Sequence, residues 1–134
     1  MANLGYLLGR AHLEHRAIAE ERLAPFALRG KEFGALRIVA EDGPMSQQRL
    51  GERMGVDRTT MVAVVDALQR EGYVERERDP ADRRAYALRV TPRGRRVLPR
   101  ATAAAEDAEE AFLLRLPPAE RDQLRRLLAA LMST

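Results

Sequence analysis

The feature of this sequence that most constrains its fold is a change of hydrophobic period at Gly72. Before Gly72, apolar residues recur at every third or fourth position, which is typical of amphipathic α-helices. After it, residues 74–78 and 86–90 follow a period of two, which is typical of β-strands. The polar segment between them, residues 79–84, contains a proline and fits a turn. The sequence therefore predicts a mainly α-helical chain with one small β-hairpin.

Two short helices are predicted immediately before the hairpin. Ser46 is a good N-cap for residues 47–54, because its hydroxyl can accept a hydrogen bond from the first free backbone N–H groups. Gly55 can adopt the left-handed conformation that ends a helix, and Asp57 can cap a second helix over residues 58–71. The buried row of this second helix is expected to consist of Met61, Val62, Val65 and Leu68.

Longer helices are predicted toward both ends of the chain. An apolar row that starts at Leu4 ends before Pro25, and another helix covers residues 29–40. After the hairpin, Thr91 can cap a helix with Pro92 at its first position, running toward Leu114 with a kink at Pro99. A last helix follows Pro117-Pro118, and its apolar row is Leu124, Leu127, Leu128 and Leu131. A length of 134 residues suits a single domain.

Composition excludes several classes of function. The chain has no cysteine, which excludes a disulfide framework, a thiol nucleophile, a thiol redox sensor and a cysteine-ligated zinc. No apolar run approaches the roughly 20 residues of a membrane span, and the N-terminus has neither the basic start nor the cleavage site of a signal peptide. We therefore expect a cytoplasmic protein without a membrane partner. No phosphate loop or nucleophile–base pair is evident, so an enzyme is not expected.

The two histidines, His12 and His15, lie three residues apart on the first predicted helix. This spacing can place both on one helix face, where they could contribute to a metal site or simply pack against a neighbouring helix. A third and a fourth ligand are not evident in the sequence. We therefore favour packing and predict no metal and no cofactor.

Positive charge is concentrated in one block of the chain. Residues 70–100 contain ten arginines and five acidic residues, whereas residues 1–69 contain nine basic and nine acidic residues. A localised basic block is typical of a surface that binds nucleic acid, although an ordinary arginine-rich surface would have the same composition. The predicted hairpin tip lies inside this block, and a solvated charged loop remains its simplest alternative.

The order of the central elements favours the nucleic-acid interpretation. A short capped helix, a glycine turn, a second capped helix and a charged hairpin form a winged helix-turn-helix. The N-terminal turn of the second helix would present free backbone N–H groups to phosphate. Thr59 and Thr60 can bond a base or a phosphate there, and Arg58 can bond guanine or phosphate. In the hairpin tip, Asp82 can orient Arg84 toward a minor groove through a bidentate pair.

Four segments of the chain are distinctive: residues 50–60 (LGERMGVDRTT), residues 68–76 (LQREGYVER), the hairpin segment DPADRR, and VTPRG at residues 90–94. In these segments the sequence resembles the MarR family of bacterial transcription regulators. The resemblance is strongest over residues 33–98. It departs from the family at Val90, where leucine is usual, and at Pro99, which is unusual within the long helix.

The resemblance implies a homodimer that binds a pseudo-palindromic operator in double-stranded DNA. Residues 1–28 and 92–134 would form the helical dimerisation region, and residues 29–91 the winged helix-turn-helix lobe that binds DNA. The predicted DNA-contacting residues are Gln47, Arg58, Thr59, Thr60, Ala63, Arg76, Arg78, Asp82, Arg83 and Arg84.

The resemblance further implies a sequence-specific regulator, most often a repressor, that a small aromatic or lipophilic ligand relieves. Such an effector would bind in the cleft between the dimerisation helices and the DNA-binding lobe. The candidate ligand-binding residues are Tyr6, His12, Arg16, Phe33 and Met45. The alternative is a winged-helix module that binds a protein and does not contact DNA, which the local arginine excess disfavours.

Overall fold

The computed structural model describes residues 3–78 and 86–133, so the predicted contacts Asp82, Arg83 and Arg84 lie outside the described residues. In chain order the elements are α1 (Leu4–Leu23), the 3-10 helix η1 (Ala24–Phe26), α2 (Gly30–Asp42), β1 (Met45–Ser46), α3 (Gln47–Met54), α4 (Arg58–Arg70), β2 (Val74–Arg78), β3 (Tyr86–Val90), α5 (Pro92–Phe112) and α6 (Pro118–Met132). The predicted fold class, mainly α-helical with a small β-hairpin, is confirmed. In the described part of the chain, every helix is too short or too polar to cross a membrane.

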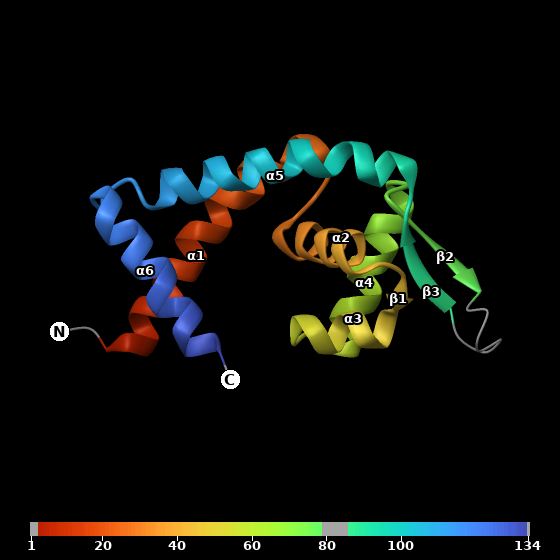
Figure 1. The fold of residues 1–134 in the computed structure, drawn as a ribbon, viewed down its shortest axis with the longest axis horizontal. Helices are drawn as coiled ribbons and strands as arrows, with labels where there is room; N and C mark the ends of the chain where they lie inside the picture. Colours follow the sequence, from red (N-terminus) through yellow and green to blue (C-terminus); the bar gives the residue numbers. More distant parts are fainter. Residues whose placement is uncertain (1–2, 79–85, 134) are drawn as a thin grey trace.

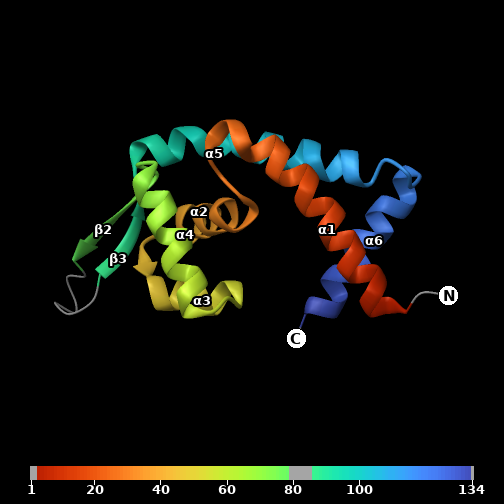
Figure 2. The same ribbon diagram turned by 180° about the vertical axis from the view of Figure 1, so that it is seen from behind.

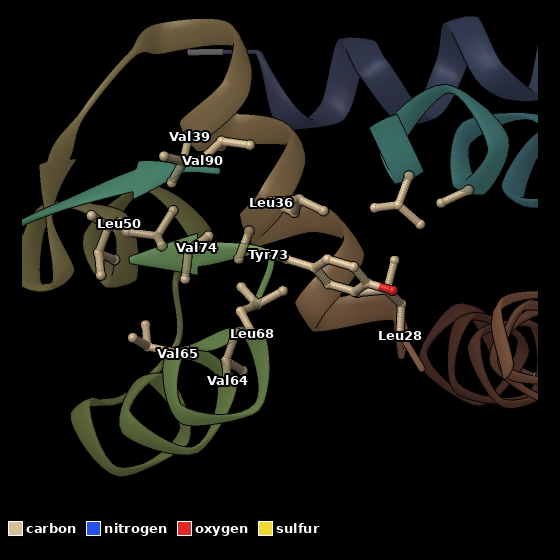
Figure 3. Close-up of a cluster of buried hydrophobic side chains, with 14 of the residues drawn as sticks. Leu28, Leu36, Val39, Leu50, Val64, Val65, Leu68, Tyr73, Val74 and Val90 are labelled. Atoms are coloured by element: carbon tan, nitrogen blue, oxygen red, sulfur yellow. The ribbon is translucent and has the colours of Figure 1, made fainter. Parts of the chain in front are cut away.

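Helices α2, α3 and α4 and the small sheet form a lobe around one aliphatic core, shown in Figure 3. Each helix contributes an apolar row to this core, and the two hairpin strands close it from one side. The labelled core residues are Leu28, Leu36, Val39, Leu50, Val64, Val65, Leu68, Tyr73, Val74 and Val90.

The sheet has three antiparallel strands in the order β1-β3-β2. Val74 of β2 lies opposite Val90 of β3, so the hairpin register places both valines in the core. The strand that the sequence does not predict is β1, in which Met45 lies opposite Leu88. A strand of two residues is too short to show a period of two, which explains why the pattern did not reveal it.

Helices α1, α5 and α6 form an arm beside the lobe. In Figure 1, α5 runs from the hairpin end of the molecule to its opposite end, where α1 and α6 lie. The reverse view in Figure 2 shows the same arrangement, with both chain termini at the end remote from the hairpin. Helix α1 packs along α5, so the first and the last third of the chain meet.

The lobe and the arm meet at a junction around Thr91 and Gly94. The Thr91 hydroxyl donates to the carbonyl of Gly72 at 2.6 Å and accepts from the N–H of Gly94 at 3.0 Å. A Cβ on Gly94 would collide with the carbonyl oxygen of Tyr73, so only glycine permits this close approach. The Tyr73 hydroxyl in turn donates to the carbonyl of Phe26 at 2.6 Å. This junction gives a structural reason for the threonine and the glycine of the matching segment VTPRG.

Two local features bear on the expectations for the helices. Val62 was expected in the buried row of α4, but it is 40% exposed, and Val64 is buried in its place at 3% exposure. The valines of α4 lie on both sides of its predicted buried row. Spacing alone therefore did not distinguish the buried valines from the exposed one. Helix α5 runs continuously through Pro99, and the kink expected at that proline stays a prediction.

Candidate DNA-binding interface and ligand cavity

The N-terminal turn of α4 is shaped by its cap. The left-handed Gly55, with φ of 67°, ends α3 and lets the chain turn into α4. Asp57 accepts a hydrogen bond from the N–H of Thr60 at 3.3 Å and another from the Thr60 hydroxyl. The hydroxyl bond is the main reason that the pKa of Asp57 lies below its ordinary value. The cap therefore fixes the turn that was predicted to meet DNA.

The outward face of α4 carries small and cationic side chains. Arg58, Thr59 and Ala63 are exposed, as expected for contacts with bases or phosphates. Val62 joins them on this face, and its methyl groups suit contact with a thymine methyl. Val62 was not predicted as a site residue, because its position in the apolar row of the helix indicated a core side chain.

Thr60 is oriented differently from its neighbours. Its hydroxyl hydrogen is donated to Asp57, so the oxygen retains only acceptor capacity for another group. The residue is half-buried and lines a cavity on the side of α1. Of the predicted recognition residues, Thr60 and Ala63 thus also line the cavity beside α1.

Gln47 and Arg76 were predicted as separate contacts, and the structure brings them together. An Arg76 Nη2 hydrogen is donated to Gln47 Oε1 at 2.9 Å. The same nitrogen lies 3.7 Å from Asp66 Oδ1 on α4. A single guanidinium therefore connects the first residue of α3, the outward face of α4 and strand β2.

The remaining described residues of the hairpin carry charge on both faces. Glu77 pairs with Arg89 across β2 and β3 at 3.1 Å. Arg78 is exposed at the end of β2, and none of the acidic residues within the described ranges lies within ion-pair distance of it. The structure thus places Arg78 next to the predicted tip.

Part of the basic block lies away from the start of α4. Arg93 donates to the carbonyl of Glu71 at 2.8 Å and lies 5.3 Å from the centre of the Tyr73 ring. Arg96 and Arg100 line the same recess on α5. Glu71 follows α4, whose 13 residues rise about 20 Å, so these arginines are remote from its N-terminal turn.

A cavity of about 360 Å³ lies between the arm and the lobe, which is within the range of small-molecule sites. Of the predicted ligand-binding residues, His12 and Arg16 line it, whereas Tyr6, Phe33 and Met45 do not. Met45 is buried in β1, and Phe33 packs against the lobe core. The lining residues are His12, His15, Arg16, Ala19, Glu20, Arg29, Gly30, Lys31, Glu32, Thr60, Ala63 and Val64.

The cavity wall mixes charge with small apolar groups. Arg16 pairs with Glu20 at 3.0 Å, which orders the guanidinium along α1. Arg29 and Lys31 lie on the opposite side, at the start of α2, so the wall includes three cationic side chains. His15 also contacts the Phe112 ring edge to face, at 5.4 Å between centroids. Across residues 3–78 and 86–133, no group of three or more potential metal-ligating side chains is present.

The arm exposes a large apolar surface at the end remote from the hairpin. Leucines on both α1 and α6 contribute to it, and their exposure is high for side chains of this size. The exposed apolar residues of this surface are Leu4, Leu7, Leu8, Leu13, Leu127, Leu128, Leu131 and Met132.

The order of the elements and the exposed turn of α4 define a winged helix-turn-helix protein. The comparisons with known proteins narrow this class. The family model described as "MarR family" matches residues 30–86. The HTH-type transcriptional repressor Rv2887 of Mycobacterium tuberculosis is 30% identical over 98% of this chain and 95% of its own length. A Thauera aromatica protein, named as a regulator of the hcr operon, is 38% identical over 74% of this chain, a match that spans only 60% of that relative.

Solved structures agree with this result. The transcriptional repressor CouR, bound to a 23-mer DNA duplex, aligns with a TM-score of 0.89 and 31% identity, covering 98% of this chain and 93% of CouR. BpsR of Bordetella bronchiseptica, whose DNA binding is regulated by 6-hydroxynicotinic acid, aligns with a TM-score of 0.87 and 27% identity, covering 98% and 94%. The chain belongs to the MarR family. Members of this family are DNA-binding transcriptional regulators and not enzymes.

Proposed function

We propose that the protein is a homodimeric, cytoplasmic transcriptional repressor whose binding to operator DNA is relieved by a small aromatic ligand. The observation that carries this proposal is the exposed N-terminal turn of α4 beside a cationic hairpin. Arg58 and Thr59 offer hydrogen-bond donors, and Val62 and Ala63 offer methyl groups, on one face of a helix that a major groove can admit. CouR, a relative of the same fold, has been solved bound to a DNA duplex, which supports DNA as the partner of this protein.

The dimer is part of the proposal because the arm leaves its leucines exposed. Leu128 and Leu131 are 40% and 66% exposed in the single chain. Covering them with the same surface of a second copy would give a two-fold dimer. Such a dimer would present two copies of α4 to half-sites about one helical turn of DNA apart.

The ligand part of the proposal rests on the cavity between α1 and α4. Because Thr60 and Ala63 line it, a bound ligand would contact the same helix that meets DNA. A ligand that fits only one arrangement of arm and lobe would shift the population toward it. Arg16, Arg29 and Lys31 outnumber the two carboxylates of the wall, Glu20 and Glu32, and this excess of positive charge suits an aromatic acid. BpsR provides a relative whose DNA binding is regulated by such a compound.

The first test is fluorescence anisotropy with a labelled duplex from the region upstream of the protein's own gene, at two salt concentrations. We expect a preference over random duplex of about a thousandfold or more and a steep dependence on salt. Equal weak binding to both duplexes would contradict sequence-specific repression from this site. An absence of binding at low salt would favour a winged-helix module that binds a protein.

The hairpin tip provides a second test of the DNA-binding surface. We expect Arg84→Ala to weaken binding on most duplexes and to lower the salt slope by about one unit, because one phosphate contact is lost. An unchanged salt slope would contradict the assignment of this arginine to the interface.

The ligand proposal is tested with 6-hydroxynicotinate and benzoate as probes. We expect a carboxylate probe to raise Tm and to release the duplex, and Arg16→Ala to lower the affinity for the probe without changing DNA affinity. Tyr6→Phe is the matched control, because Tyr6 does not line the cavity. If both variants respond like the wild type, the cavity is not the binding site for these acids.

A further inference from the structure

Arg76 lies where the hydrophobic core meets the DNA-facing side of the lobe. Side chains two residues apart on a strand share one face, so Val74, Arg76 and Arg78 point the same way. Val74 is buried in the core. The Arg76 side chain therefore leaves β2 on its core-facing side, not on the outer face of the hairpin, and reaches toward α3 and α4.

The partners of Arg76 come from two helices. Its Nη2 atom donates to Gln47 Oε1 at 2.9 Å, which is an ordinary hydrogen-bond distance. Asp66 Oδ1 lies 3.7 Å from the same atom, which is an ion-pair distance. The hairpin, α3 and α4 are thus connected through this one guanidinium, to which we refer as the Arg76 clasp.

The clasp determines which atoms Gln47 can offer to another molecule. A guanidinium has only donors, so it must face the amide oxygen of Gln47 and never the amide nitrogen. The two N–H groups of Gln47 Nε2 are left for another acceptor. Gln47 is the first residue of α3, where the backbone N–H groups also lack helical partners. Gln47 thereby adds two donors to a helix start that favours phosphate.

The charge of Arg76 is partly compensated within the clasp. Asp66 lies on the outward face of α4 and is close enough to offset the positive charge of the guanidinium. A compensated guanidinium contributes little to counterion release when a protein binds DNA. Arg78, on the same face of the strand, has no acidic partner within the described ranges.

We propose that Arg76 is a positioning residue: it fixes the hairpin against α3 and α4 and turns the Gln47 amide donors toward the phosphate backbone, and it does not contact DNA itself. This inference rests on the DNA binding proposed above. It revises the expectation that Arg76 and Gln47 are two independent contacts.

The test is a double-mutant cycle on a duplex that the wild-type protein selects from a random pool. The full-length variants are Arg76→Gln, Gln47→Ala and the combination of both. We expect each single variant to lose at least about tenfold in affinity, because a hydrogen bond to a charged group is lost in each case. The combination should be no weaker than the worse single variant, because both remove the same arrangement. Losses that multiply would overturn the proposal.

The salt slope separates positioning from phosphate contact. We expect Arg76→Gln to keep the wild-type slope, whereas the control Arg78→Gln should lower it by about one unit. A slope that falls equally with Arg76→Gln would show that Arg76 itself contacts phosphate, and the proposal would be wrong.

Gln47→Glu keeps the proposal testable if Arg76→Gln does not fold. The new carboxylate can still accept from Arg76, so the unfolding midpoint in urea should be unchanged or higher. DNA affinity should fall below that of Gln47→Ala, because the donors are lost and a negative charge faces phosphate. Wild-type affinity in Gln47→Glu would overturn the proposal. Failure of the wild-type protein to select any duplex would overturn the proposed function as well.

Discussion

The helices of the lobe bury their leucine rows, whereas the last helix of the arm, α6, leaves a leucine row of the same spacing exposed. Leu36, Leu50 and Leu68 are at most 1% exposed. Leu127 and Leu131 of the arm, by contrast, are 53% and 66% exposed. A regular apolar row thus predicts that a face will be covered, but not whether the same chain covers it. In this protein the described part of the chain leaves the row of α6 exposed.

This difference separates two kinds of stability. The lobe closes its core within one chain, so its folding should not depend on protein concentration. In the proposed dimer the arm would bury its outer leucines by association, so we expect its contribution to stability to depend on protein concentration. Substitutions that affect one region and leave the other intact can therefore test whether the stability of the two regions differs in its dependence on protein concentration.

The largest effect is expected from Leu128→Glu. A charge on the exposed row of α6 would oppose the burial that a dimer requires, because an unpaired charge is costly to desolvate. We expect a monomer in analytical ultracentrifugation and loss of specific DNA binding, with the lobe still folded. Ala129→Glu is the control, because it introduces the same charge elsewhere on α6. Ala129 is exposed near the side of α6 that lies opposite the leucine row. If Leu128→Glu remains a dimer, this row is not the interface.

Leu36→Ala tests the lobe in the same way. Leu36 is fully buried in α2, so its truncation to alanine removes buried apolar surface and leaves a cavity. We expect a loss of about 2–5 kcal/mol in the free energy of unfolding, measured in urea and independent of protein concentration. Leu131→Ala is the matched substitution in the arm, and its effect should vanish in dilute protein. Equal behaviour of the two variants would remove the distinction between lobe and arm.

A smaller loss is expected at the junction between the two regions. In Gly94→Ala the new Cβ would collide with the Tyr73 carbonyl, and the start of α5 would have to move away from β2. We expect a loss of about 1–3 kcal/mol, as for other overpacked sites. Gly30→Ala is the control, because no atom lies within 4 Å of a Cβ at that position. A Gly94→Ala variant as stable as the wild type would show that the junction adapts freely.

Much of the fold was predictable because local chemistry and the final structure agree. Ser46, Asp57 and Thr91 each cap the helix that the sequence assigned to them. What the sequence missed depends on distant contacts. The strand β1 exists because Met45 pairs with Leu88, more than 40 positions further along the chain.

The candidate site was predictable in its elements but not in its pairings. The sequence placed Arg58 and Thr59 on an exposed helix face, as the structure does. It gave no sign that Arg76 would meet Gln47, because the two are 29 residues apart and belong to different elements. Residue type predicts which groups are available, whereas pairing depends on how the hairpin packs against α3 and α4.

The smallest effect concerns the cap of α4 and depends on pH. The pKa of Asp57 in the folded lobe is below its ordinary value of 3.8, chiefly because the Thr60 hydroxyl donates to it. The charged carboxylate is thus the form that stabilises the fold. Its contribution is complete above pH 3.8 and declines as pH falls toward the lower folded pKa.

Asp57→Asn isolates this contribution, because asparagine also caps helices but does not titrate in this range. We expect the wild type to have the higher Tm at neutral pH and the difference to shrink on acidification below pH 3.8. The measurement is Tm from circular dichroism between neutral pH and the acid limit of folding. A difference that stays constant with pH would mean that the charge of Asp57 does not stabilise α4. In that case Asp57 would stabilise the N-terminal turn of α4 through its hydrogen bonds alone and not through its charge.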